Sequence, residues 1–281
     1  MDIRPPFSPF RRHKTAAALI VIEIALACAI ICNAIYLIDQ RLERMQAPSG
    51  VVENELLRIQ LASPSTTTRD GGGKAVVQQD LGILRGFPGV VSAASVDHLP
   101  FGNSSSNSGV RLKREQQVNT LNAATYVGNE TMLDTFGLRL VAGRNFNADE
   151  YQDMEVLETS GDTGVVPSVI ITRNMAERMY PGEDPIGKTL YSWGNGPTVV
   201  VGVDEGLMRP SQFGDGEYSM LLPIRFHQNG LNYIVRVDPA RRDEVLKNAV
   251  DALKKADPTR VLINQDKLTD MRTKYFQQDR M

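Results

Sequence analysis

The chain has 281 residues, of which 42% are apolar, 23% charged and 6% aromatic. This length and apolar fraction allow one large or two small folded domains and exclude a wholly disordered chain. The formal net charge is −2, which argues against nucleic acid as a partner, because nucleic-acid binders usually carry a basic excess on one face. Two cysteines four residues apart and three scattered histidines indicate neither a disulfide framework nor a metal site.

Residues 15–38 form the longest apolar segment, and Glu23 is its only charged residue. A helix of this length spans about 36 Å, enough to cross a hydrocarbon core of about 30 Å. A cleaved signal peptide is the alternative, but its apolar region is usually about 7–15 residues long and is followed by small residues at the cleavage site. Residues 25–28 faintly resemble a lipoprotein cleavage box, but mostly apolar residues continue after Cys28, which is unusual for the start of a lipoprotein. The segment therefore predicts one uncleaved transmembrane helix in a lipid bilayer.

The charges that flank this segment predict its orientation. Residues 1–14 contain Arg4, Arg11, Arg12 and Lys14, opposed only by Asp2, whereas basic and acidic residues balance just after the segment. Positive charge favours the cytoplasmic side. We therefore expect a cytoplasmic basic tail at 1–14, a single membrane pass at 15–38, and the rest of the chain outside the cytoplasm.

Small residues gather on one face of the predicted membrane helix. At 100° per residue, Ala25, Cys28, Ala29 and Cys32 fall on this face, and Glu23 lies almost opposite. Small residues allow a second helix to approach closely, and a carboxyl group at mid-membrane needs a partner or a water-filled cavity. Two interpretations remain open: a protonated Glu23 tolerated by lipid, or a helix that packs in a bundle with helices outside this chain.

The segments that follow predict two β-α-β units. The first combines strands at 51–62 and 90–96 with a helix at 75–87, and a loop rich in Ser, Thr and Gly at 63–74 interrupts it. The second combines strands at 232–237 and 260–264 with an amphipathic helix at 239–256. Two such units that pair in one sheet make a ferredoxin-like arrangement, so the fold class is α+β.

Residues 99–223 differ from both units. Short strands at 109–113, 120–127, 138–142, 168–172 and 198–203 alternate with polar loops, and a short helix is predicted at 174–180. This pattern indicates a β-rich lobe that is inserted into the ferredoxin-like lobe, which itself comprises 48–98 and 224–265. A charged C-terminal helix is expected at 266–281.

Residues 182–189 match G-x-x-x-x-G-K-T, the phosphate-binding P-loop pattern. A P-loop follows a buried strand and opens a helix whose N-terminus faces the phosphates. Here the match follows a predicted helix, Pro185 lacks one of the required N–H donors, and a Gly-Asn-Gly turn comes soon afterwards. We therefore interpret the match as turn chemistry rather than a nucleotide site.

The remaining candidates do not combine into a site. The serines of 103–109 have no paired histidine, and the acidic residues of 149–162 fit no EF-hand spacing, so both segments are expected to be loops. His98 and His227 are expected at the surface or in turns, and Trp193 in packing. We predict no catalytic residues, no cofactor, no metal and no enzymatic activity.

Several segments taken together resemble a known family. In order they are the helix ALIVIEIALACAIICNA, then LRGFPGVVSAASVDHLPFG, FGLRLVAGRNF, VIITRNMAERMYPGEDPIGKTLY and TVVVGVDEG. This order resembles the first helix and periplasmic core domain of MacB/FtsX-like ABC-transporter permeases over residues 11–265. The most specific part is the run from Asn174 to Leu190, which resembles a structural turn of that family.

The resemblance implies a periplasmic domain with a porter lobe and an inserted β-rich lobe, anchored in the inner membrane. It also implies two partners, a cytoplasmic ABC ATPase subunit and a second permease copy or homologue. The function expected from it is that of a permease component whose outer domain transmits ATP-driven motion for export or efflux. The alternative is a stand-alone membrane-anchored binding or scaffold module.

Family permeases carry three further membrane helices after this domain, whereas the sequence ends at Met281. The expectation is therefore a fragment or a truncated gene product, in which 266–281 leads to membrane segments that are absent from this sequence.

Overall fold

The computed structural model describes residues 14–62, 72–102, 104–160, 164–193, 196–211, 217–227 and 232–277. It divides into two units, one that contains helix α1 up to Ala47 and one that comprises Pro48–Gln278. Apart from Lys14, the predicted basic tail lies outside the described residues. So does most of the loop predicted at 63–74.

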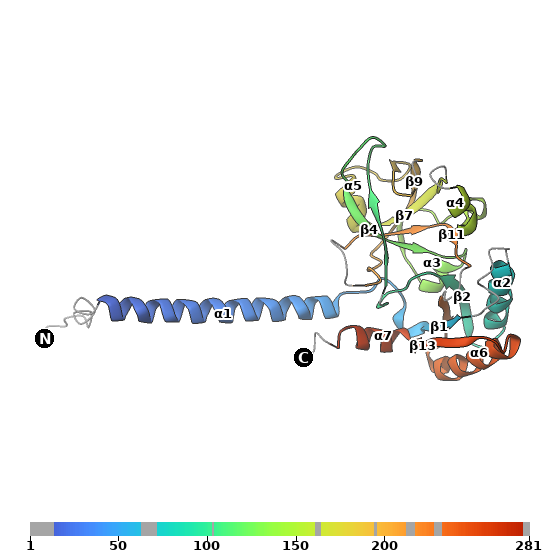
Figure 1. Ribbon diagram of the computed structural model, residues 1–281, viewed down its shortest axis with the longest axis horizontal. Helices are drawn as coiled ribbons and strands as arrows, with labels where there is room; N and C mark the ends of the chain where they lie inside the picture. The colour runs from blue at the N-terminus through green and yellow to red at the C-terminus, as the bar shows by residue number, and fades with distance from the viewer. Residues whose placement is uncertain are drawn as a thin grey trace. The chain divides into compact units, whose positions relative to one another are not determined.

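Helix α1 is continuous over Lys14–Gln46 (Figure 1). Within the described part of the chain, its segment Ala18–Gln46 is the one helix long and apolar enough to cross a membrane. Apolar side chains such as Leu19 and Ile22 are more than 60% exposed. Such a surface is stable only against lipid or other apolar helices. The helix continues two turns beyond the predicted membrane segment, because good helix formers follow and no proline comes before Pro48.

The first sheet of the second unit combines strands from both ends of the sequence. Its order is β13-β1-β12-β2, and all neighbouring strands are antiparallel. The strands are β1 (Leu56–Ala62), β2 (Val90–Val96), β12 (Asn232–Val237) and β13 (Val261–Lys267). Helix α2 (Gly72–Arg85) connects β1 to β2, and helix α6 (Arg242–Ala256), preceded by the short 3-10 helix η5 (Pro239–Arg241), connects β12 to β13. Each of these helices thus connects two strands of the same sheet.

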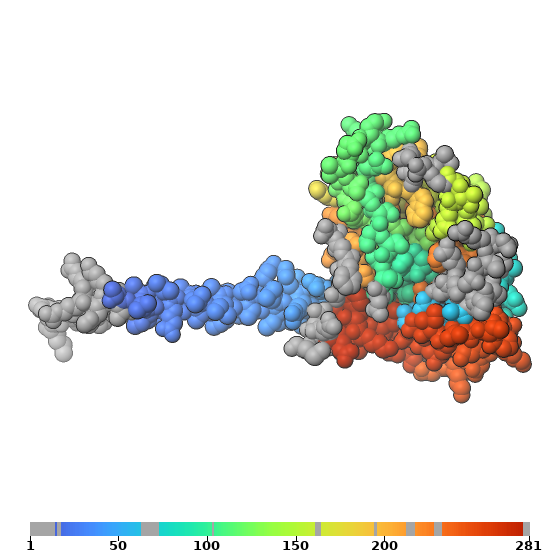
Figure 2. Space-filling view, in the orientation of Figure 1, coloured from blue at the N-terminus to red at the C-terminus, as the bar shows by residue number. Residues whose placement is uncertain are grey.

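Helices α2 and α6 cover one face of this sheet. Alternate residues of β1, namely Leu57, Ile59 and Leu61, are buried in a core with Leu84 of α2 and Leu253 of α6. This alternation follows from the two-residue repeat of a strand, and the helical residues follow the 3.6-residue repeat of an amphipathic helix. In the space-filling view, α6, β13 and α7 lie together along the lower side of this unit (Figure 2).

The other face of the first sheet carries shorter elements. They are the 3-10 helix η1 (Glu53–Glu55), helix α3 (Met132–Phe136) and helix α7 (Leu268–Tyr275). Asp266 of β13 accepts hydrogen bonds from Arg58 of β1 at 2.5 Å and from Lys274 of α7 at 2.8 Å. Helix α7 lies within the segment 266–281 that was expected to be a C-terminal helix, but residues up to Lys267 belong to strand β13.

A second, seven-stranded sheet is formed within residues 106–222. Its order is β3-β4-β10-β7-β9-β5, with β8 paired to β9. Pairs β4/β10 and β7/β9 are parallel, and the other pairs are antiparallel. The strands are β3 (Ser106–Val110), β4 (Leu121–Val127), β5 (Leu140–Gly143), β7 (Ser168–Thr172), β8 (Thr189–Leu190), β9 (Thr198–Asp204) and β10 (Ser219–Leu222).

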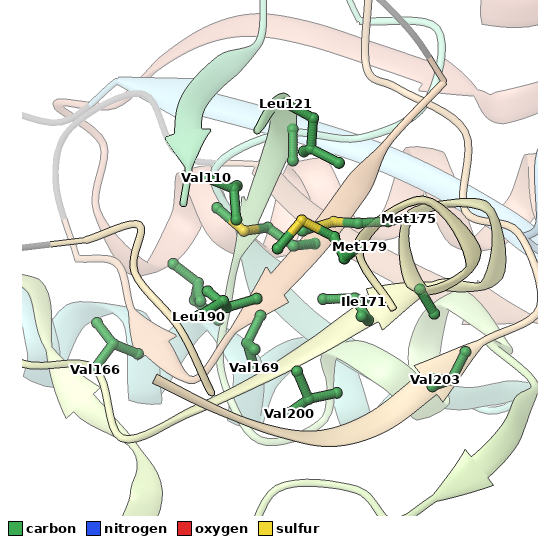
Figure 3. Packing of buried hydrophobic residues seen from close by; sticks show 14 of the residues in the cluster. Val110, Leu121, Val166, Val169, Ile171, Met175, Met179, Leu190, Val200 and Val203 are labelled. Carbon is green, nitrogen blue, oxygen red and sulfur yellow. The ribbon is translucent and has the colours of Figure 1, made fainter. Parts of the chain in front are cut away.

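The core of the second sheet lies between its strands and helix α5 (Arg173–Met179). Met175 and Met179 of α5 lie in one buried cluster with Ile171 and Val203 of the parallel pair β7/β9 (Figure 3). Trp193 packs against this core, as predicted. Both faces of β7 are buried, and its sequence SVIIT accordingly shows no polar alternation.

Two segments differ from the expected loops. Residues 106–109 of the expected serine loop belong to edge strand β3, which pairs with β4. The acidic segment contains the 3-10 helix η3 (Ala148–Glu150) and helix α4 (Met154–Ser160), because Met154 and Leu157 are buried in the second core. A two-stranded parallel sheet joins β6 (Gln152–Asp153) to β11 (Ile224–Arg225).

A buried ion pair connects helix α2 to the residue before β13. Arg260 Nη1 lies 2.7 Å from Asp80 Oδ1, and the two side chains are 3% and 2% exposed. The Tyr233 hydroxyl donates to the other carboxylate oxygen at 2.6 Å. Burial raises the pKa of Asp80, and the hydrogen bonds from Tyr233 and Arg260 only partly oppose this effect.

Removal of this buried cation should strongly destabilise the second unit, Pro48–Gln278, which is called the outer unit below. Arg260→Met keeps much of the aliphatic volume but leaves Asp80 without a charge partner, so we expect a loss of about 3–5 kcal/mol in the free energy of unfolding. Arg241→Met is the matched control, because Arg241 pairs with Glu244 at the surface and such pairs contribute about 0–1 kcal/mol. Denaturant unfolding of the full chain in detergent micelles, followed by circular dichroism, measures both. Equal losses in the two variants would contradict the prediction.

Candidate functional site

The residues predicted to contact other helices all lie in α1. Glu23, Ala25, Cys28, Ala29 and Cys32 are exposed, and the two cysteines are free thiols. Their partners are not part of this chain's described structure, so their roles in packing or polar contact stay predictions.

The P-loop-like turn at 182–189 is a structural turn. The N–H of Gly187 donates to the carbonyl of Val200 at 2.8 Å, and strand β8 rather than a helix follows the motif. Lys188 forms an ion pair with Glu183 and lies over the Tyr180 ring. A phosphate cradle needs free N–H groups and a free lysine, so this geometry does not suit a nucleotide.

The other polar candidates do not form a reactive cluster. Among the described residues, no group of three His, Cys, Asp or Glu side chains could hold a metal ion. His227 was expected at the surface or in a turn; it follows β11 outside the helices and strands, but its side chain is not at the surface, because it is only 6% exposed and its Nδ1 lies 3.6 Å from Glu155 Oε2. Nothing in the sequence pattern indicated this burial, which results from the packing of the chain after β11.

The chain enters the outer unit through a junction formed by Pro48–Glu55. Ser49 is 2% exposed, and its carbonyl accepts a hydrogen bond of 3.0 Å from the N–H of Met208, in the loop after β9. The N–H of Val52 donates to the carbonyl of Phe136, at the end of α3, at 3.0 Å. The junction is therefore bonded both to the loop of the second sheet and to a helix on the first sheet.

Glycine is required at Gly50 of the junction. Its φ is +82°, in the left-handed region, and a Cβ at this position would overlap the carbonyl oxygen of Gly206. This close approach fixes the junction against the loop after β9.

The junction also contacts α7, near the end of the described chain. Glu53 accepts hydrogen bonds from the Ser49 hydroxyl and from Arg272 Nη1, both at 2.5 Å. The Arg272 guanidinium stacks over the rings of Phe101 and Phe276, at 5.4 and 5.9 Å. One carboxylate thus connects the entering chain to Arg272 of α7 and, through it, to the rings of Phe101 and Phe276.

Asp204 shapes the loop that the junction touches. Its Oδ2 accepts hydrogen bonds from the N–H groups of Gly206 at 3.0 Å and Leu207 at 2.7 Å. The side chain is buried, and this burial raises the pKa of the carboxyl group, although the two N–H groups favour its charged form.

A cavity of about 460 Å³ lies beside helix α2 and is called the α2 cavity below. It is lined by Lys74, Val77, Gln78, Leu81, Arg85, Ser95, Asn129, Glu130, Thr131, Arg225 and His227. The lining comes from α2, β2, the segment before α3 and the end of β11. The sequence pattern did not indicate that these residues meet, because they are up to about 150 positions apart.

The described chain combines one helix that is long and apolar enough to cross a membrane with a mixed α+β unit. The sequence model for the MacB-like periplasmic core domain matches residues 15–253, so the chain belongs to this family. This domain is the periplasmic part of ABC-type transporter permeases. Such permeases are generally non-catalytic, and membership of the family implies ATPase and permease partners. No curated protein sequence matches the chain.

Solved structures that are similar to this chain include the following three. The extracellular domain of the noncanonical ABC-type transporter YknZ from Gram-positive bacteria is 17% identical, with TM-score 0.45, over 74% of this chain and 100% of that one. The periplasmic region of MacB from Actinobacillus actinomycetemcomitans is 15% identical, with TM-score 0.48, over 79% of this chain and 94% of that one. A domain of a permease protein from Porphyromonas gingivalis is 19% identical, with TM-score 0.44, over 76% of this chain and 91% of that one.

Gly50→Ala should destabilise the junction more than a matched change elsewhere. Gly182→Ala is the control, because Gly182 has a similar φ of +75° but has no atom within 4 Å of the position that a Cβ would occupy. Both variants carry the cost of a left-handed alanine, about 1 kcal/mol, and only Gly50→Ala adds the overlap with Gly206. Thermal unfolding should show a clearly larger loss for Gly50→Ala, and equal losses would contradict the close approach.

Asp204→Asn should change how stability depends on pH. The raised pKa means that the folded state holds the Asp204 proton more tightly than the unfolded state, so its contribution is present below about pH 4 and is lost as pH rises through the folded pKa. Asparagine keeps an oxygen acceptor and does not titrate. The melting temperature of the variant relative to wild type should therefore rise from pH 4 to pH 7, and a difference that is constant with pH would refute the assignment.

Proposed function

We propose that the chain is a non-catalytic permease component, or part of one, of a MacB-like ABC transporter that works in export or efflux. ATP hydrolysis by a separate cytoplasmic ATPase displaces α1, and the outer unit transmits this motion. The observation that carries the proposal is the buried junction at Pro48–Glu55. Only Ala47 and Pro48 separate the end of α1 from Ser49, which is already buried and hydrogen-bonded.

The contacts of the junction support transmission to the whole outer unit. A displacement at Ser49 acts directly on Met208 in the loop after β9, and one at Val52 acts on the end of α3. A displacement at Glu53 acts on α7 through the hydrogen bond between Glu53 and Arg272. Because hydrogen bonds have narrow ranges of length and angle, the loop after β9, the end of α3 and helix α7 move together with the junction.

We propose a porter-like lobe at 48–98 and 224–265 with ferredoxin-like topology, and an inserted β-rich lobe at 99–223. In chain order, the first sheet has the strand order fourth-first-third-second, with one helix between the first two strands and one between the last two. The helices lie on one face, as the right-handed crossover of a β-α-β unit requires. The second sheet uses residues between β2 and β12 only.

We propose that helix α1 makes contacts within the membrane through its face of small residues and, almost opposite, through Glu23. Ala25, Cys28, Ala29 and Cys32 pack against a helix of a second permease copy or homologue, and Glu23 meets a polar partner or water in the bundle. Exposure of all five side chains is compatible with contacts outside this chain. The basic residues before the helix favour a cytoplasmic N-terminus in the inner membrane and a periplasmic outer unit.

A stand-alone anchored binding module is the second candidate, and the α2 cavity favours it. Its volume of about 460 Å³ lies in the range of small-molecule sites. Such a module would bind its ligand without an ATPase, whereas the permease component needs one.

Purification from the native membrane distinguishes the two. The full chain, tagged and expressed at its natural level, should copurify with an ABC ATPase and show vanadate-sensitive ATP hydrolysis. Lys188→Ala should leave this activity unchanged, because Lys188 belongs to a structural turn. A well-folded chain that never binds an ATPase would refute the permease assignment.

Glu53→Gln should interrupt transmission without loss of assembly. Hydrogen-exchange mass spectrometry on the purified complex compares the apo state with the ATP-vanadate state. We expect nucleotide-dependent exchange changes in α7 of the wild type and at most half of that change in Glu53→Gln, because the ion pair with Arg272 is lost. Glu244→Gln, which breaks the surface pair with Arg241, is the control and should behave like wild type. An unchanged response in Glu53→Gln would exclude this route.

A further inference from the structure

The α2 cavity has walls from separate parts of the outer unit. Val77, Leu81 and Arg85 come from successive turns of α2, Thr131 lies just before α3, and Arg225 belongs to β11. A space of this volume with both apolar and polar walls can hold a small organic molecule.

The cations of the lining differ in how their charge is balanced. Lys74 Nζ lies 2.7 Å from Asp153 Oδ2, and Arg225 Nη2 lies 2.5 Å from Glu130 Oε1. Arg85, in contrast, has no carboxylate within ion-pair distance among the described residues. It is therefore the cation of this lining whose charge remains open to an anion.

Neutral oxygens hold Arg85 in place. Its Nη2 donates to the carbonyl of Ala93 at 2.8 Å and to the Thr131 hydroxyl at 3.1 Å, and that hydroxyl in turn donates to the same carbonyl at 2.8 Å. The described hydrogen bonds use Nη2 alone, which leaves the Nε and Nη1 donors for another acceptor. A guanidinium fixed in this way needs little reordering to bind a carboxylate.

The rest of the lining suits the remainder of such a ligand. Val77 and Leu81 are one turn apart on α2 and give the cavity an aliphatic strip. Ser95 is 1% exposed, and its hydroxyl has no hydrogen-bond partner among the described residues. A buried hydroxyl without a partner costs free energy, so a polar ligand atom that reached it would gain binding energy.

We propose that the α2 cavity binds a small aliphatic monocarboxylate, with the carboxylate on Arg85 and the aliphatic part against Val77 and Leu81. This inference is independent of the transmission of motion proposed above. The shared chemistry is a carboxylate on an apolar body, which a short fatty acid and the C-terminal residue of a peptide both provide.

Methyl NMR of the full chain in nanodiscs tests the proposal. Hexanoate and N-acetylleucine are the two probes, and they separate a fatty-acid source from a peptide source. At least one of them should shift the methyl resonances of Val77 and Leu81 in a saturable way. The corresponding neutral amides, hexanamide and N-acetylleucinamide, should bind at least about tenfold more weakly, because they lose the charge-assisted hydrogen bond.

Arg85→Gln should weaken the same probe by about tenfold or more. Arg178→Gln is the matched control, because Arg178 is also an exposed arginine in the last turn of a helix but does not line the cavity. It should bind like wild type. Unchanged methyl spectra of both variants without a probe show that they are folded. The proposal is overturned if neither carboxylate shifts these methyls, if the amides bind equally well, or if Arg85→Gln binds like wild type.

Discussion

The chain must pass from an apolar helix into a polar folded unit within a few residues, and the buried backbone at Ser49 makes this passage specific. A buried carbonyl needs a donor, and Met208 supplies it from the loop after β9. The approach of Gly50 to Gly206 is so close that only a glycine fits. The position of this loop, which Asp204 shapes, is thus linked to the entry of the chain.

The same passage connects the two sheets of the outer unit. The first sheet takes its strands from both ends of the unit, and the second sheet forms between them. Polar contacts join the first sheet to α3 on the chain between β4 and β5, such as the hydroxyl contact of 2.6 Å between Ser92 and Thr135. Arg236 of β12 also pairs with Glu55 of the junction at 2.5 Å. These contacts connect the junction and the first sheet to elements formed by distant parts of the sequence.

Charged groups serve different purposes in different parts of the unit. Asp80 and Arg260 are buried and satisfied by each other and by Tyr233, so they define how α2 packs near β13. Arg85, only five residues after Asp80, is held by neutral oxygens and faces a cavity instead. One face of α2 therefore contributes to the core, and its last turn contributes to a surface that can receive an anion.

Elements with a local signal could be predicted from the amino-acid sequence, whereas the meeting of distant residues could not. The predicted strands at 90–96, 168–172 and 232–237 agree with β2, β7 and β12, and the predicted helices correspond to α1, α2, α5 and α6. Apolar periodicity and the breaks at Pro48 and Pro88 are enough for this, because both act within a few residues. The P-loop-like match could also be rejected locally, from Pro185 and the turn that follows.

Strand β10 and helix α4 lacked a clear pattern, since their burial depends on neighbours in the second sheet. The junction, the burial of His227 and the α2 cavity each join segments tens to more than a hundred residues apart. No local pattern encodes such proximity, because it arises from the packing of whole elements and from the pairing of buried polar groups.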